Sequence, residues 1–316
     1  MQTPTSAPDP RIKALRRFAA SITIFTLLGH LWLGFEQAYL TPVVGLLTAY
    51  SMDLALETLE ARMQRRPVRY AGGWRELVNF LLPAHIAGLA CAMLMYGNAR
   101  LAPTAFAVAA AVTSKYLIRV RIGGKPRHIL NPSNAGIALT LILFPWVGIA
   151  QPYEFTENVT GVIDWIVPLA ILASGTMLNA KLTRKMPLIL GWVAGFAAQA
   201  VIRSLLSDVS LVAALLPITG TAFILFTNYM ITDPGTTPFE PRRQAGFGLA
   251  VAAAYGVLVS LHISFGLFFA LVAVCILRAV TIAVRNRFES RTPTPEPLPA
   301  MPELSAASLS GSGGRT

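Results

Sequence analysis

The sequence predicts an all-α polytopic membrane protein with about ten transmembrane helices. Of its 316 residues, 54% are hydrophobic and only 13% are charged, whereas a soluble domain carries about 25% charged residues. The apolar residues gather into repeated runs, and a helix needs roughly 20 such residues to cross a bilayer. Composition and run length together therefore predict a polytopic membrane protein, with the lipid bilayer as a partner.

The apolar runs predict where the helices lie, with an error of about four residues at each boundary. They cover approximately residues 18–36, 39–58, 77–97, 101–120, 134–150, 162–180, 186–206, 211–232, 245–264 and 265–285. The fifth run is short and the last two are nearly continuous, so nine or eleven spans are the alternatives.

The distribution of Lys and Arg predicts the orientation. With residues 1–17 in the cytoplasm, every Lys and Arg except Arg100 and Arg203 falls in an inner segment, namely 1–17, 59–76, 114–133, 181–185, 233–244 or 278–316. The outer loop 151–161 instead carries Glu154 and Glu157. This asymmetry follows the positive-inside rule and places both termini in the cytoplasm. It also accounts for the net charge of +11, so no nucleic-acid partner is expected.

Three regions follow along the chain. Residues 1–17 form a cytoplasmic N-terminal segment, residues 18–285 the ten-helix transmembrane domain, and residues 286–316 a cytoplasmic tail. No cleavable signal peptide is expected, because the first span follows the basic start without a small-residue cleavage motif. From about Ser290 the tail is rich in Pro, Ser and Gly, which is typical of disorder.

Two Asx-Pro pairs stand where a predicted span meets an inner loop. One opens the fifth run and the other follows the eighth. A residue before proline avoids the helical region, and Asn or Asp side chains cap neighbouring backbone. Polar groups gathered there are candidates for ligand binding: Asn131, Pro132, Asn134, Thr232, Asp233, Pro234, Thr236 and Thr237. The alternative is that these residues only cap helices that end at the membrane surface.

Asp53 and Glu57 lie four residues apart near the inner end of the second span, hence on one helical face. An ionisable residue within a span is a functional candidate, here for carrying a proton or an ion. The alternative is pairing with arginines at the membrane interface, for which Arg62, Arg65 and Arg66 are available.

Other polar residues have simpler interpretations. Cys91 and Cys275 fall inside apolar runs without metal-ligand spacing and are expected to be buried thiols. The histidines His30, His85 and His262 lie in different helices, which favours hydrogen-bonded roles over haem ligation. Asn179 and Asn228 either join helices or line the ligand site, and Gly195, Gly246 and Gly248 indicate close helix packing. No hydrolase motif is present, so neither a catalytic nor a metal site is expected.

Around the two Asx-Pro pairs the chain resembles the RnfD/NqrB family, the flavin-carrying membrane subunits of ion-pumping redox complexes. Family members have a Gly-rich lead into an Asn-Pro-Ala motif and an apolar helix that ends in a Ser-Phe-Pro-like turn. They also carry an Ala-Thr-Asp-Pro-x-Thr-Ser-Pro motif. The corresponding segments here are Ile122-Gly-Gly-Lys-Pro-Arg-His-Ile-Leu-Asn-Pro-Ser-Asn-Ala-Gly136, Leu143-Phe-Pro145 and Ile231-Thr-Asp-Pro-Gly-Thr-Thr-Pro238. The resemblance runs from about Arg66 to Arg285 and implies an RnfD/NqrB-like bundle of ten helices.

One departure from the family concerns its covalent FMN, which is joined to a Thr within a pattern like Asp-x-x-Ser-Gly-Ala-Thr. The matching outer loop reads Glu157-Asn-Val-Thr-Gly-Val-Ile163. Ile163 has no hydroxyl, so a phosphoester cannot form there; only a slipped pattern would make Thr160 the acceptor. Covalent FMN is therefore not expected. The resemblance instead implies a non-covalent flavin, riboflavin or FMN, at the inner loops.

A narrower resemblance, to the UnbU-type RnfD-like proteins of enediyne biosynthetic clusters, fits this departure. This narrower resemblance implies service to natural-product biosynthesis. The RnfD/NqrB resemblance implies an electron-transfer subunit in a bacterial inner membrane, with redox partner subunits and at most a share in a redox-driven oxidoreductase or translocase. The first alternative is a membrane transporter or permeation protein for a small metabolite. The second is a structural scaffold for other pathway enzymes.

Overall fold

The computed structural model describes residues 10–151 and 153–289 and is mostly helical. Within these residues, four helices are long and apolar enough to cross a membrane, judged by length and composition. They are α3 (Trp74–Leu94), α6 (Ile163–Leu178) extended by the π-helical turn η2 (Asn179–Thr183), α7 (Met186–Leu206) and α11 (Gly266–Glu289). A bent pair of helices adds a fifth candidate. The chain is thus a helical protein with several potential membrane spans, and ten spans stay a prediction.

Helix occurs in each of the ten predicted runs, but only four of these helices, or five with the bent pair, are long and apolar enough to cross a membrane. The remaining helices are α1 (Pro10–Leu28) with the π-helical turn η1 (Gly29–Leu33), α2 (Thr41–Met63), α4 (Ala102–Leu117), α5 (Pro132–Leu143) and α10 (Pro241–Ser260). The helix in the fifth run is α5, which has 12 residues and is too short to cross a bilayer alone.

The eighth run is broken rather than straight. It consists of α8 (Leu211–Leu215), the 3-10 turn η3 (Leu216–Thr219), α9 (Thr221–Leu225) and the π-helical turn η4 (Phe226–Met230). Its two halves are bent by 67°. The break has a local cause, because Pro217 cannot donate a helical hydrogen bond and Gly220 ends the 3-10 turn in an extended conformation.

The predicted ends of the chain lie partly outside the described residues. Residues 1–9 and 290–316 are not described, which covers most of the N-terminal segment and of the tail expected to be disordered. The first and the last of the described residues, Pro10 and Glu289, are helical. Residues 10–17 belong to α1 and residues 286–289 to α11, so both helices extend beyond the apolar runs that predicted them.

Two small antiparallel ribbons interrupt the helices. Strand β1 (Met95–Tyr96) pairs with β4 (Gly148–Ile149), and β2 (Arg119–Ile122) pairs with β3 (Lys125–His128). Gly123 and Gly124 join the second pair with φ of 58° and 77°, which is the backbone that a two-residue hairpin turn requires. The prediction of an all-α chain missed this hairpin. It lies beside α11, where Asn286 Nδ2 donates to the Arg121 carbonyl at 2.8 Å.

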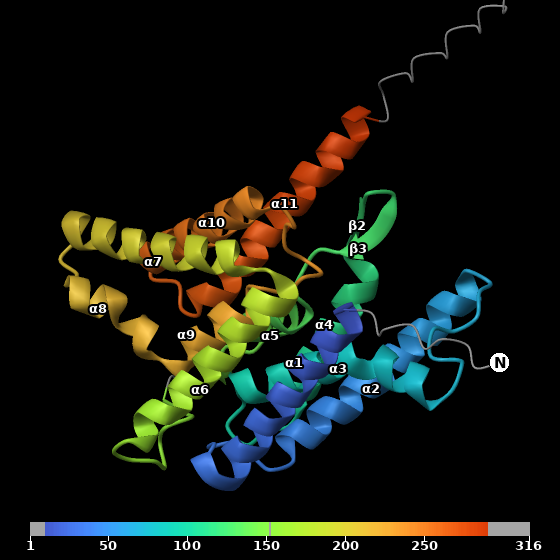
Figure 1. The fold of residues 1–316 in the computed structure, drawn as a ribbon, viewed down its shortest axis with the longest axis horizontal. Coiled ribbons are helices and arrows are strands. Elements are labelled where there is room, and N and C mark those ends of the chain that lie inside the picture. Colours follow the sequence, from blue (N-terminus) through green and yellow to red (C-terminus); the bar gives the residue numbers. More distant parts are fainter. Residues whose placement is uncertain (1–9, 152, 290–316) are drawn as a thin grey trace, which may run out of the picture.

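Helices α7 and α10 lie side by side and make the most extensive contact between helices among the described residues (Figure 1). A Cβ added to Gly248 would stand 2.4 Å from the Leu188 carbonyl oxygen, and one added to Gly195 would stand 2.7 Å from Ala252 Cβ. Glycine is thus required for the two backbones to approach. At Gly246 an added Cβ would meet nothing within 4 Å, so that residue does not take part.

The largest core cluster centres on Trp192 of α7, which is fully buried. Its ring stacks on Phe223 with centroids 5.6 Å apart, and its Nε1 donates to Thr227 Oγ1 at 2.9 Å. Helix α7 turns its other face outward, where Leu206 is 82% exposed. Contact with lipid favours a helix of this kind, which buries its aromatic face and exposes leucine on the other.

Candidate functional site

The two Asx-Pro loops lie together, and the side chain of Asn131 joins them. Asn131 precedes α5 in an extended conformation, and its Oδ1 accepts from the Asn134 backbone N–H at 3.1 Å and from Ser133 Oγ at 2.9 Å. Its Nδ2 donates to the Met230 carbonyl at 2.9 Å. One amide therefore caps a helix and bridges segments that are 99 residues apart in the chain.

The second loop is built by its own polar groups. Asp233 Oδ1 accepts from the Gly235 N–H at 3.1 Å, and its Oδ2 accepts from Thr236 Oγ1 at 3.0 Å. Thr237 Oγ1 donates to the Asp233 carbonyl at 2.6 Å, and Thr232 Oγ1 donates to the Asn228 carbonyl at 2.7 Å. The three threonines are buried. Their hydrogen bonds stabilise the loop itself.

The two prolines differ in exposure, since Pro132 is half-buried and Pro234 is exposed. Between the loops, His128 Nε2 lies 3.9 Å from Asp233 Oδ2. The predicted residues are therefore neighbours, and most of their polar atoms already have protein partners.

Asn134 has one polar atom without a partner. Its Nδ2 donates to the Phe268 carbonyl at 3.0 Å, whereas its Oδ1 is buried and accepts no hydrogen bond from the described residues. A buried acceptor that lacks a donor costs about 1–3 kcal/mol. A donor from a ligand or a water molecule would remove that cost, so Asn134 Oδ1 is the atom of this cluster most suited to binding.

Two cationic side chains contact the second loop, and neither belongs to the site residues predicted from the sequence. Lys185 is 1% exposed and its Nζ donates to the Pro238 carbonyl at 2.6 Å. Arg278 Nη1 donates to the Thr236 carbonyl at 2.5 Å. Burial lowers the pKa of Lys185 to about 8; nearby Asp233 raises it and Arg278 lowers it further. Arg278 lies inside the apolar run of the last helix, and a charged residue in such a run is a signal for a functional site.

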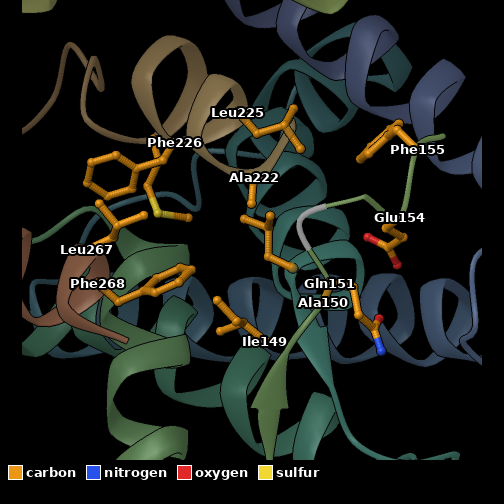
Figure 2. Close-up of a pocket in the computed structure, with 12 residues that line it drawn as sticks. Ile149, Ala150, Gln151, Glu154, Phe155, Ala222, Leu225, Phe226, Leu267 and Phe268 are labelled. Atoms are coloured by element: carbon orange, nitrogen blue, oxygen red, sulfur yellow. The ribbon is translucent and has the colours of Figure 1, made fainter. Parts of the chain in front are cut away.

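A small cavity lies behind the two loops (Figure 2). Met230 and Phe268, whose carbonyls accept from Asn131 and Asn134, belong to its wall. Its volume of about 20 Å³ admits roughly one water molecule, whereas ligand pockets typically measure 300–1,000 Å³. A planar ring could enter this region only if side chains such as Phe268 moved.

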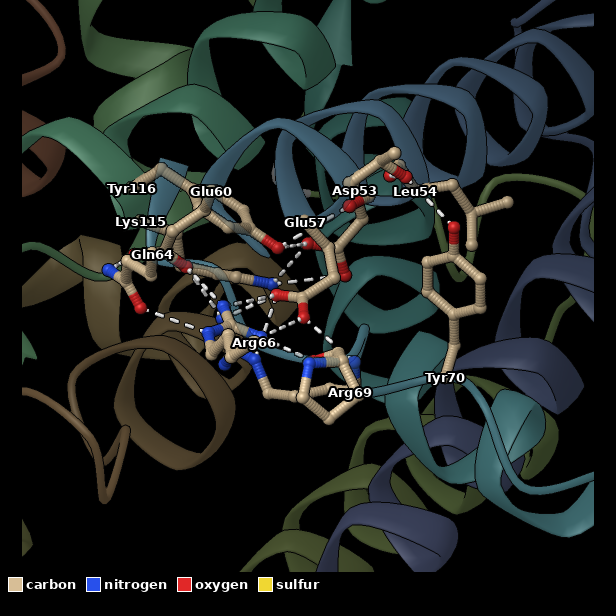
Figure 3. A network of polar contacts seen from close by, with 12 residues as sticks. Asp53, Leu54, Glu57, Glu60, Gln64, Arg66, Arg69, Tyr70, Lys115 and Tyr116 are labelled. Atoms are coloured by element: carbon tan, nitrogen blue, oxygen red, sulfur yellow. Dashed lines mark hydrogen bonds and ion pairs between the residues drawn. The ribbon is translucent and has the colours of Figure 1, made fainter. Parts of the chain in front are cut away.

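Asp53 and Glu57 are fully buried in a network of ion pairs (Figure 3). Lys115 Nζ lies 2.9 Å from Asp53 Oδ1, and Tyr116 donates to the same oxygen at 2.7 Å. Glu57 accepts from Arg66 Nη1 at 2.6 Å and from Arg69 Nε at 2.8 Å.

Arg66 is one of the three arginines predicted as partners, and it pairs with Glu57. The second partner of Glu57, Arg69, was not predicted, nor were the partners of Asp53, Lys115 and Tyr116. Lys115 and Tyr116 come from α4, which no local pattern in α2 identifies. The role of Asp53 and Glu57 in carrying a proton or an ion stays a prediction.

The remaining candidates make structural contacts. His85 is hydrogen-bonded on both ring nitrogens, to Thr23 Oγ1 at 2.7 Å and to Tyr50 OH at 2.6 Å. Asn179 Nδ2 donates to the Asn228 carbonyl at 2.7 Å and joins two helical segments. Both cysteines are buried thiols. In the described part of the chain, no group of three or more His, Cys, Asp or Glu residues is arranged to hold a metal ion.

Comparison of the sequence with models of known protein families gives no match, and comparison with curated proteins gives no significant match.

Proposed function

We propose that this chain is a membrane electron-transfer subunit of RnfD/NqrB type that binds a non-covalent flavin, riboflavin or FMN, at the two Asx-Pro loops. The observation that carries the proposal is the hydrogen bond from Asn131 Nδ2 to the Met230 carbonyl. It brings together the two motifs on which the family resemblance rests, although they are far apart in the sequence.

The polar groups at the loops suit the edge of an isoalloxazine ring, which presents both donors and acceptors. Asn134 Oδ1 has no partner among the described residues and can accept from a ring N–H. Lys185 and Arg278 place positive charge beside the second loop, and positive charge stabilises electrons added to a nearby group. When bound, the flavin would supply the redox chemistry, while the chain orients and polarises it.

The proposal includes a rearrangement, because the cavity behind the loops has a volume of about 20 Å³. Phe226 and Phe268 line it, and their displacement would open space for the ring. The free energy for this opening would come from burying the apolar faces of the ring between helices.

The proposed setting is a bacterial inner membrane, with both termini in the cytoplasm and with redox partner subunits that deliver and remove electrons. The natural-product context, of enediyne type, belongs to the same proposal. Ile163 stands where the family's flavin acceptor would be, so the flavin is proposed to be held without a covalent bond.

The test is the visible absorption of the full chain purified in detergent, before and after acid or heat denaturation. We expect flavin absorption that moves completely into the supernatant on denaturation. Asn131→Ala combined with Asp233→Ala should lower flavin occupancy several-fold. Gly246→Ala is the matched control, because its new Cβ meets nothing within 4 Å.

Two results would contradict the proposal. A colourless protein that takes up neither added riboflavin nor added FMN would remove the flavin. Flavin that stays on the denatured chain would overturn the non-covalent attachment and direct attention to Thr160.

The bent eighth run supports a second candidate, a transporter for a small metabolite. Its two halves are bent by 67° relative to a straight helix, and α5 is also short. Discontinuous helices are typical of transporters, in which their ends line a central site. A protein that stays colourless with added flavin and moves a solute into liposomes would favour this candidate.

A further inference from the structure

Glu154 is a buried carboxyl group on the loop that follows β4. Only 4% of the residue is exposed, and no described residue donates a hydrogen bond or forms an ion pair with its carboxylate. Figure 2 shows its side chain at the wall of the cavity, on the side away from Phe226 and Phe268. A carboxylate in a largely buried position is costly to ionise, so this group calls for an explanation.

The surroundings of Glu154 are apolar or acidic. Among the residues that line the cavity, Gln151 is the only other polar one, and its Nε2 donates to Glu36 at 3.2 Å. The segments α9, η4 and the start of α11 contribute only apolar side chains to the wall. The charged groups that act on Glu154 are Glu157 of its own loop and Glu36 of the loop before α2.

We propose that Glu154 is a proton-binding site that connects the predicted outer face of the protein with the cavity behind the Asx-Pro loops. The carboxyl group faces a space of about one water molecule. Across that space stand Met230 and Phe268, which hold Asn131 and Asn134 through their carbonyls. A proton bound to Glu154 therefore lies across this cavity from the residues that hold Asn131 and Asn134.

A proton fits this site better than a metal ion. No group of three or more His, Cys, Asp or Glu residues converges for metal binding in the described part of the chain. Burial raises the pKa of Glu154 to about 8, and the negative charges of Glu157 and Glu36 add to the effect. The carboxyl group is thus protonated near neutral pH and loses its proton as the pH rises through its pKa of about 8.

The linked effect on stability has a definite sign. Because the folded chain holds this proton up to a higher pH than the unfolded chain, stability falls as the pH rises from the ordinary Glu pKa toward 8. Glu154→Gln cannot ionise, so its melting temperature should fall less than that of the wild type across this range. The proposed proton site rests on the burial of Glu154 and on the cavity beside it, and it does not depend on a bound flavin.

The direct test is an infrared pH titration of the full chain in detergent. A protonated carboxyl C=O band should disappear with a midpoint near pH 8, shift in D₂O, and be absent from Glu154→Gln. Glu157→Gln and Glu36→Gln should each lower the midpoint, because each removes a negative charge beside the site. Asp208→Asn, which removes an exposed acidic residue outside this cluster, is the control and should leave the midpoint unchanged.

Three results would overturn the proposal. The first is a carboxyl band that persists in Glu154→Gln. The second is a midpoint that stays unchanged in both Glu157→Gln and Glu36→Gln, and these two variants remain informative if Glu154→Gln does not fold. The third would be a midpoint that falls when sodium chloride replaces choline chloride at equal ionic strength. That result would identify a cation that competes for the carboxylate, not a site for protons alone.

Discussion

The amide of Asn131 offers both an acceptor and a donor, and the fold uses each for a different contact. The acceptor caps α5 through the Asn134 N–H, and the donor reaches the Met230 carbonyl. An aspartate would retain the cap but lose the bridge, because a carboxylate has no donor. The choice of Asn at this position is therefore explained by the contact between the loops and not by helix capping alone.

Asp53 illustrates how a buried charge depends on a cationic partner, which is Lys115 among the described residues. Lys115→Met would leave the fully buried Asp53 carboxylate with only the Tyr116 hydroxyl. Removing one member of a buried ion pair costs about 3–5 kcal/mol, which thermal unfolding in detergent should reveal as a clear drop in melting temperature. The double variant Asp53→Asn with Lys115→Met should recover much of that loss.

The matched control for this pair is Arg243→Met, which breaks the exposed pair between Arg243 and Glu240. An exposed pair contributes about 0–1 kcal/mol, so the control should unfold close to the wild type. Equal effects of Lys115→Met and Arg243→Met would show that the Asp53 ion pair contributes little to stability.

At the scale of elements, the contact between α7 and α10 depends on glycine. In Gly248→Ala the new Cβ would stand 2.4 Å from the Leu188 carbonyl oxygen and 2.5 Å from the Trp192 nitrogen. Both are backbone atoms, so only a separation of the helices can relieve the overlap. Overpacking of this kind costs about 1–3 kcal/mol, and we expect a lower melting temperature in detergent.

Gly246 provides the matched control on the same helix. Its added Cβ meets nothing within 4 Å, and alanine is favoured over glycine in a helix by about 1 kcal/mol. Gly246→Ala should therefore be neutral or stabilising. If both alanine variants behaved alike, close packing at Gly248 would not be what holds these helices together.

The β2–β3 hairpin and the bend in the eighth run show what the reading of apolar runs overlooks. Both have local causes that the sequence contains, since Gly123-Gly124 favours a hairpin turn and Pro217 interrupts a helix. A long apolar stretch predicts one span whether or not it is bent, and the turn of the hairpin lies in the inner segment 114–133, between two apolar runs.

At the scale of the whole molecule, the proposed orientation can be tested by labelling cysteines in intact cells. Glu157 lies on the predicted outer loop and Lys125 on the hairpin of the predicted inner face, and both are exposed. A maleimide that does not cross the inner membrane should label Glu157→Cys, and should label Lys125→Cys only after the membrane is opened. The native Cys91 and Cys275 are buried, so the unmodified chain should give little background.

The opposite labelling pattern would place the Asx-Pro loops on the outer side and reverse the proposed direction of proton entry. Labelling of both positions in intact cells would contradict a membrane between them. Either result would leave the contacts within the bundle unchanged, because those contacts do not depend on orientation.

The sequence by itself determined that the chain is helical and apolar enough for a membrane, and roughly where each helix lies. Those properties follow from hydrophobicity and proline or glycine positions, which act over one or two helical turns. It also identified the two loops that lie together. Tertiary structure alone decided that Lys185 and Arg278 hold the second loop, that Lys115 pairs with Asp53, and that Glu154 is buried. Each of these depends on segments distant in sequence, whose approach no local pattern encodes.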